Sequence, residues 1–153
     1  MRKYFLTCAV ALLAASTANA TTDYAEVTAK ATIEVANSLY CTDDLKFGTI
    51  VVKQNNSAST VTIDDSGQPI IAGDIISVSE PDDGDNAVQC FDHDDNVIEG
   101  NLSHPTTIKL SNGTNELDVT LLSNGGNITG ILHIPPMVNK GDYTGSFTVS
   151  YTY

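Results

Sequence analysis

The last thirteen residues of the chain alternate strictly between two kinds of side chain. Aspartate, threonine and serine occupy every second position, and tyrosine, phenylalanine, valine and two glycines occupy the positions between them. Successive side chains of a strand point to opposite faces, so the stretch predicts a half-buried β-strand that neighbouring strands must hold. The apolar face comprises Tyr143, Gly145, Phe147, Val149, Tyr151 and Tyr153.

The rest of the chain repeats short β-branched segments broken by Gly, Asn, Asp and Pro, with no convincing helical periodicity. Residues 111–115 and 123–127 are strong turn sequences. Eight or nine such segments predict one all-β domain, an antiparallel immunoglobulin-like sandwich. The expected strands are residues 26–38, 48–53, 60–63, 74–79, 87–91, 106–110, 116–122, 130–134 and 144–153.

The N-terminal twenty residues have the pattern of a secretory signal peptide. Arg2 and Lys3 precede an apolar run over residues 4–15, and Ala18-Asn19-Ala20 is a small-residue cleavage site. The apolar run is too short for a stable membrane-spanning helix. We expect residues 1–20 to be removed and residues 21–153 to be exported as a soluble protein without membrane insertion.

Removal of the signal peptide leaves five lysines, no arginine and nineteen acidic residues, a net charge of −14. Phosphate backbones and anionic lipids would repel such a protein, so we expect no binding to nucleic acid or to a membrane surface. The same step leaves Cys41 and Cys90, which we expect to form a disulfide in an oxidising compartment. Free thiols or a metal pair are the alternatives, although no histidine lies at ligand spacing from either cysteine.

Residues 21–36 also alternate, but sixteen residues are far more than a usual strand contains. We therefore interpret residues 21–35 as an extension that leaves the domain, and residues 36–153 as the sandwich. The apolar face of the extension is rich in alanine and includes Ala25, Val27, Ala29, Ala31 and Ile33.

Three short motifs frame nearly the whole mature chain: Leu45-x-Phe47-Gly48-x-Ile50, Gly130-Ile131-Leu132-x-Ile134 and the alternating C-terminal stretch. In their order, and with a signal peptide in front, they resemble subunits of bacterial fimbriae assembled by the chaperone–usher route. The chain is similar, more narrowly, to an uncharacterised pilin-like family of single immunoglobulin-like domains.

The resemblance implies a sandwich that lacks its last strand and is completed by donor-strand complementation. A periplasmic chaperone would fill the open groove first, and the extension of the next subunit would then replace it after passage through an outer-membrane usher. Under this interpretation the apolar face of the C-terminal strand lines the groove, and Ala25 to Ile33 form the donor strand. The protein would then be a structural subunit at the cell surface. The alternative is a self-complete secreted or periplasmic sandwich, in which the first strand pairs with the last, acting as a lectin-like adhesin or a calcium-binding module.

Clustered acidic residues are weak calcium candidates because hard cations prefer oxygen ligands. The EF-hand pattern fails, since Val97 stands where glycine is needed, and a solvated acidic loop is the simpler interpretation. The scattered histidines His93, His104 and His133 predict no zinc site or nucleophile–base pair, so we expect neither an enzyme nor a cofactor. The calcium candidates are Asp82, Asp83, Asp85, Asp92 and Asp94.

Overall fold

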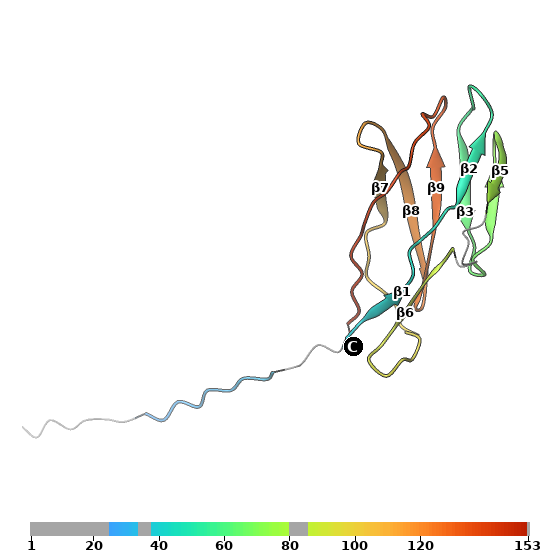
Figure 1. The fold of residues 1–153 in the computed structure, drawn as a ribbon. Helices are drawn as coiled ribbons and strands as arrows, with labels where there is room; N and C mark the ends of the chain where they lie inside the picture. Colours follow the sequence, from blue (N-terminus) through green and yellow to red (C-terminus); the bar gives the residue numbers. More distant parts are fainter. Residues whose placement is uncertain (1–24, 34–37, 80–85, 153) are drawn as a thin grey trace, which may run out of the picture. The chain divides into compact units, whose positions relative to one another are not determined.

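The computed structural model describes residues 25–33, 38–79 and 86–152. The chain separates into two units, Met1–Glu34 and Val35–Tyr153. In the first unit, residues 25–33 form no helix or strand and are all exposed. Within the described part of the second unit there are nine strands and no helix. Figure 1 shows how these strands are arranged. No helix among the described residues has the length and apolar character needed to cross a bilayer.

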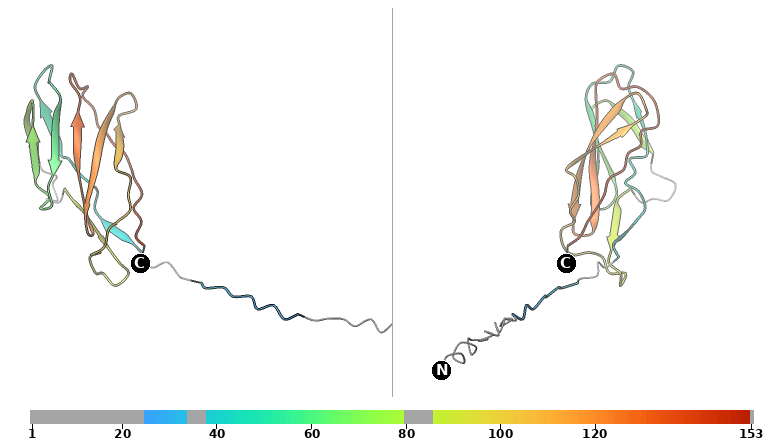
Figure 2. Two further views of the ribbon diagram at one scale, coloured as in Figure 1. Left: turned by 180° about the vertical axis from the view of Figure 1, so that it is seen from behind. Right: turned by 90° about the vertical axis from the view of Figure 1, so that its left-hand side faces the viewer.

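The strands are antiparallel throughout, and β9 lies at the centre of the larger sheet. One edge of β9 pairs with β8, and β3 and β6 share its other edge. Beyond these, β7 pairs with β8, β4 with β3 and β1 with β6, while β2 and β5 form a separate two-stranded sheet (Figures 1 and 2). The strands are β1 (Tyr40–Thr42), β2 (Thr49–Val52), β3 (Ser59–Ile63), β4 (Pro69–Ala72), β5 (Ile75–Ser79), β6 (Val88–Phe91), β7 (Thr107–Ser111), β8 (Glu116–Asn124) and β9 (Asn127–Ile134).

Alternation along the central strands builds the core. In β8, Leu117, Val119 and Leu121 are buried, whereas Asp118 and Thr120 lie on the outer face. Apolar side chains of β2, β5 and the C-terminal segment pack onto the inner face of the large sheet and form the second layer of a β-sandwich. The predicted all-β antiparallel sandwich is therefore confirmed.

The core has two parts. The large core cluster comprises Phe47, Val61, Ile63, Leu117, Val119, Leu121, Leu132 and Ile134. The disulfide core cluster comprises Val88, Cys90, Ile98, Leu102 and Ile128.

The expected disulfide is present at the β1–β6 pair. Cys41 and Cys90 are directly opposite in register, their Cα atoms are 3.9 Å apart and their sulfur atoms are bonded. Cys90 is fully buried in the disulfide core cluster, so the bond ties the short strand β1 to the core.

Two of the expected strands are absent as regular strands. Residues 25–33 form no strand, and residues 34–37 of that expected strand lie outside the described residues. Residues 144–152 run beside β7 but are held by only two isolated bridges, because their pairing shifts register between them. Conversely, β1 and β4 form where the sequence analysis predicted no strand.

Both predicted turns close hairpins: residues 111–115 connect β7 to β8, and residues 123–127 connect β8 to β9. In the first turn, Asn112 Oδ1 accepts hydrogen bonds from the backbone N–H groups of Thr114 and Asn115 at 3.0 and 2.7 Å. An asparagine side chain that bonds to its own turn is the expected device at such a site.

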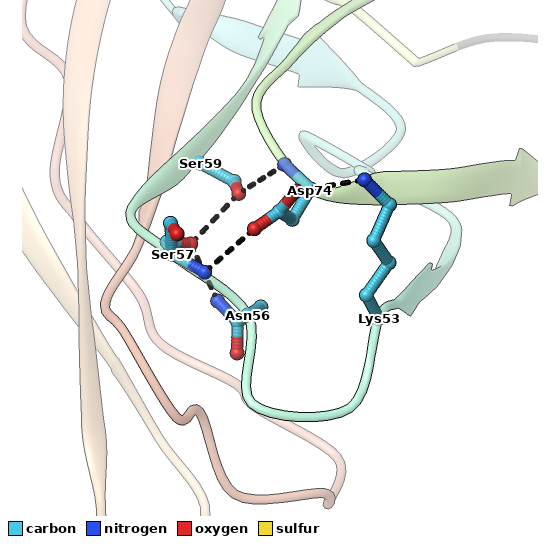
Figure 3. A network of polar contacts seen from close by, with 5 residues as sticks. All are labelled: Lys53, Asn56, Ser57, Ser59 and Asp74. Carbon is cyan, nitrogen blue, oxygen red and sulfur yellow. Dashed lines mark hydrogen bonds and ion pairs between the residues drawn. The ribbon is translucent and has the colours of Figure 1, made fainter.

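A polar network ties the loop after β2 to the turn before β5 (Figure 3). Asp74 accepts a hydrogen bond from Lys53 Nζ at 2.8 Å and another from the Ser57 N–H at 2.9 Å, while its own N–H donates to Ser59 Oγ at 2.9 Å. Asn56 Nδ2 donates to the carbonyls of Ser57 and Pro135 at 2.8 and 2.9 Å. The bond from Lys53, followed by the bonds from Ser57, lowers the pKa of Asp74 to about 2 from its ordinary 3.8.

We expect this network to weaken in acid. The pKa of Asp74 is lower in the folded protein, so its contribution to stability is full above pH 3.8 and is lost as the pH falls through about 2. Asp74→Asn should lower the melting temperature at pH 5, and the difference from the unmodified protein should shrink as the pH approaches 2. Asp142→Asn, on the exposed C-terminal segment, makes the same charge change and serves as the control. If the melting temperature of Asp74→Asn stays below that of the unmodified protein by the same amount down to pH 2, the lowered pKa assigned to Asp74 is wrong.

Candidate functional site

The second unit contains an open groove of about 1270 Å³ between residues 39–52 and residues 138–149. Its floor is the inner face of the large sheet, including Ile108, Leu110, Val119, Ile128 and Leu132. The residues 39–52 form one wall, called here the N-terminal rim, and residues 138–149 form the other, called here the C-terminal rim. In Figure 1 the C-terminal rim descends towards the C-terminus, and the N-terminal rim rises from β1 to β2.

The side chains of the C-terminal rim follow the alternation seen in the sequence. Tyr143, Phe147 and Val149 are partly buried against the core, and the polar residues between them are exposed. The Tyr143 hydroxyl donates to the backbone carbonyl of Asn139 at 2.8 Å, which fixes the polar end of this ring at the mouth of the groove.

Backbone hydrogen bonds hold the C-terminal segment to the β7 side at two places. The N–H and C=O groups of Thr144 pair with those of Ser111 at 3.1 and 2.8 Å, and those of Ser150 pair with Ser103 at 2.9 and 2.8 Å. A Cβ atom placed on Gly145 would lie 2.4 Å from the carbonyl oxygen of Lys109, so only glycine allows so close an approach to β7.

Among the described residues, nothing pairs with the other backbone edge of the C-terminal rim over residues 143–149. Successive residues of an extended chain direct their N–H and C=O groups to opposite edges. The backbone N–H and C=O groups of Thr144 and Ser150 point to the β7 side. Those of the odd-numbered residues between them therefore point into the groove. Among the described residues, no hydrogen bond reaches the backbone groups of Tyr143, Gly145, Phe147 or Val149. The groove thus combines an apolar floor with an unpaired strand edge.

The N-terminal rim is held from its outer side. β1 pairs with β6, the Lys46 N–H donates to the carbonyl of Asn86 at 3.1 Å, and β2 pairs with β5. Leu39, Leu45, Ile50 and Val52 of this rim are partly buried hydrophobic residues packed against the core. The two rims run in opposite directions, so a strand inserted between them would be antiparallel to one and parallel to the other.

The structure places most of the predicted groove residues at this site. Tyr143, Gly145, Phe147 and Val149 line the groove. Tyr151 packs against the disulfide core cluster beside the groove, and Tyr153 lies outside the described residues.

The N-terminal rim was not predicted as a wall of the groove, although the closely spaced apolar residues Leu45, Phe47, Ile50 and Val52 are a signal for it. The predicted donor residues Ala25, Val27, Ala29, Ala31 and Ile33 lie in the first unit, where all are exposed.

The calcium candidates divide into two groups. Asp82, Asp83 and Asp85 lie outside the described residues. Asp92 Oδ1 accepts hydrogen bonds from the N–H groups of Asn96 and Asp94 at 3.0 and 2.9 Å, and the bond from Asn96 is the main cause of its lowered pKa. This carboxylate therefore closes its own turn. Over residues 25–33, 38–79 and 86–152, no three His, Cys, Asp or Glu side chains are placed to hold a metal ion.

The histidines lie on different elements and have separate partners. His133 Nε2 is 3.0 Å from Thr120 Oγ1 on the outer face of the sheet. His104 contacts the Pro105 carbonyl and Ser123 Oγ, both at 2.9 Å. His93 Nε2 is 3.2 Å from a carboxylate oxygen of Asp94.

No protein-family model, curated protein or solved structure matches the chain.

Proposed function

We propose that this protein is a structural subunit of a bacterial surface fibre, and that a strand from another subunit fills its groove. The observation that carries the proposal is the unpaired backbone edge of Tyr143, Gly145, Phe147 and Val149 beside an apolar floor. An added strand would supply the missing ladder bonds, and its alternate side chains would enter the groove, which is the physical basis of β-augmentation.

The proposed occupant is residues 25–33 of a second copy or of a related subunit. Val27 and Ile33 are each 87% exposed in the first unit, so their burial in a groove would remove nearly the whole of both side chains from water. Burial of one such side chain is worth about 1.5–3 kcal/mol. The polar face of the same segment, Glu26, Thr28, Lys30 and Thr32, would remain in solvent.

The proposal includes a route to the surface. The signal sequence supports export, and an unfilled groove supports the need for a periplasmic chaperone that covers it until an outer-membrane usher delivers the subunit to the fibre. The finished fibre would lie at the cell surface. The order of these partners, first the chaperone and then the usher, is taken from the resemblance of the motifs to chaperone–usher subunits. The proposal includes an immunoglobulin-like arrangement of the strands.

The test is electrophoresis in SDS of mature protein recovered from the native cell surface, with heated and unheated samples side by side. We expect a ladder of multiples that collapses on heating, since breaking it requires a whole strand to be withdrawn. Deletion of residues 21–31 should abolish the ladder. Val27→Asp should weaken it because the charge would enter the groove, whereas Thr28→Asp, on the opposite face, should leave it unchanged.

The opposite result has a clear meaning. A single monomer band in both lanes, from protein that unfolds cooperatively alone, would show a sandwich that completes itself, and the fibre proposal would be wrong.

A further inference from the structure

The donor segment has an unusual order of side-chain sizes on its apolar face. Large residues stand at Val27 and Ile33, and the two positions between them are Ala29 and Ala31. This large–small–small–large order is symmetric about Lys30, so it reads the same whichever way the strand enters. A groove that accepts it must be narrow in the middle and wider at both ends.

The groove has a side chain from each rim at its middle. Leu45 from the N-terminal rim and Phe147 from the C-terminal rim are the two partly buried residues that pack against both core clusters. The Leu45 side chain also lies directly over the floor, because a Cβ on Gly130 of β9 would be 3.2 Å from Leu45 Cδ2. These two side chains, called here the central pair, therefore occupy the space between the clusters.

Each end of the groove is lined by residues that pack against one cluster only. Leu39 and Val149 pack only against the disulfide core cluster. Ile50, Val52 and Tyr143 pack only against the large core cluster. In an extended strand of about 3.3 Å per residue, Val27 and Ile33 lie about 10 Å on either side of Lys30. That distance equals three residues along a rim, which places them level with Tyr143 at one end and Val149 at the other when Lys30 is level with Ser146, the neighbour of Phe147.

We infer that the central pair sets the register of the inserted strand: Ala29 and Ala31 lie against Leu45 and Phe147, and Val27 and Ile33 fill the two ends. The inference rests on the proposed function, since its occupant is the segment of residues 25–33 from a second copy. The alanines are then a specific fit to this groove. A one-residue slip would turn the polar face inward, and a two-residue slip would drive Val27 or Ile33 towards the central pair.

The test uses the full mature chain and the temperature at which the unheated ladder collapses. Ala29→Leu and Ala31→Leu should each lower that temperature or abolish the ladder, although leucine adds apolar surface, because the new side chain would meet the central pair. Thr28→Leu and Thr32→Leu, which make similar additions on the solvent face, should not. The double variant Ala31→Leu with Phe147→Leu should regain part of the lost ladder stability, because the smaller leucine at position 147 leaves room for the leucine at position 31.

Cysteine cross-linking provides a second measurement that does not depend on the strength of the ladder. Lys30→Cys combined with Ser146→Cys, the exposed position level with it, should form an intermolecular disulfide. Glu26→Cys combined with Ser146→Cys, about 13 Å out of register, should not.

The outcomes separate the two proposals. If the unmodified protein gives no ladder, the fibre proposal itself fails. If it gives a ladder that Ala29→Leu and Ala31→Leu leave unchanged or strengthen, the fibre proposal stands and the assigned register is wrong. Cross-linking through Glu26→Cys rather than Lys30→Cys would overturn the register in the same way.

Discussion

Replacing Cys41 and Cys90 together with alanine is expected to lower the free energy of unfolding by about 4 kcal/mol, measured by urea denaturation. The bond joins positions 49 residues apart, and without it the unfolded chain regains the freedom of that loop. The three residues of β1 pair only with β6, so this end of the N-terminal rim has few other attachments. A loss of this size is a large part of the stability of an ordinary domain.

The control for this prediction is the reducing agent. Dithiothreitol should destabilise the unmodified protein to the same extent and leave the double variant unchanged. A double variant within about 0.5 kcal/mol of the unmodified protein, the usual range for a neutral surface substitution, would contradict the assigned role.

The regular part of the fold was predictable because its alternation is coupled to burial. In β3, Val61 and Ile63 are buried while Thr60 and Thr62 face outward. With this order of residues, only the face that carries the valine and the isoleucine can pack against the core. The turn residues then set where each strand ends, as Asn112 does between β7 and β8.

The missed strands have weaker local signals. β4 begins with Pro69 and contains two adjacent isoleucines, Ile70 and Ile71, so it shows no alternation. It forms because Asp64 closes the preceding turn, accepting hydrogen bonds from the N–H groups of Ser66 and Gln68 at 2.9 Å, and returns the chain along β3. The three residues of β1 are all exposed, and their pairing depends on Cys90, far away in the sequence.

The C-terminal segment shows what alternation alone leaves open. The pattern placed Tyr143, Phe147 and Val149 on one apolar face, and these residues line the groove in the structure, but the pattern did not reveal that only one backbone edge is paired. Pairing depends on residues elsewhere in the chain, here Ser103 and Ser111. The N-terminal rim was missed for the same reason, since Leu45 becomes a groove residue only through its contact above Gly130.

The N-terminal rim also contains the position where a single methyl group should have the largest effect. Gly48 has a φ of +71°, in the left-handed region, and lies immediately before β2. A Cβ at this position would be 1.9 Å from the carbonyl oxygen of Ser79, a backbone atom of the partner strand β5. Two costs therefore combine: the left-handed conformation, about 1–2 kcal/mol, and the clash, for which overpacking typically costs about 1–3 kcal/mol.

We expect Gly48→Ala to lower the free energy of unfolding by about 2–5 kcal/mol and to weaken assembly, because β2 must move away from β5 and shift the rim. Gly113→Ala is a matched control: its φ is +87°, and nothing lies within 4 Å of the added Cβ. That variant should show only the conformational cost, so the difference between the two variants measures the contact with Ser79. Equal losses in the two variants would mean that β2 is free to shift, and the N-terminal rim could not then act as a fixed wall for the inserted strand.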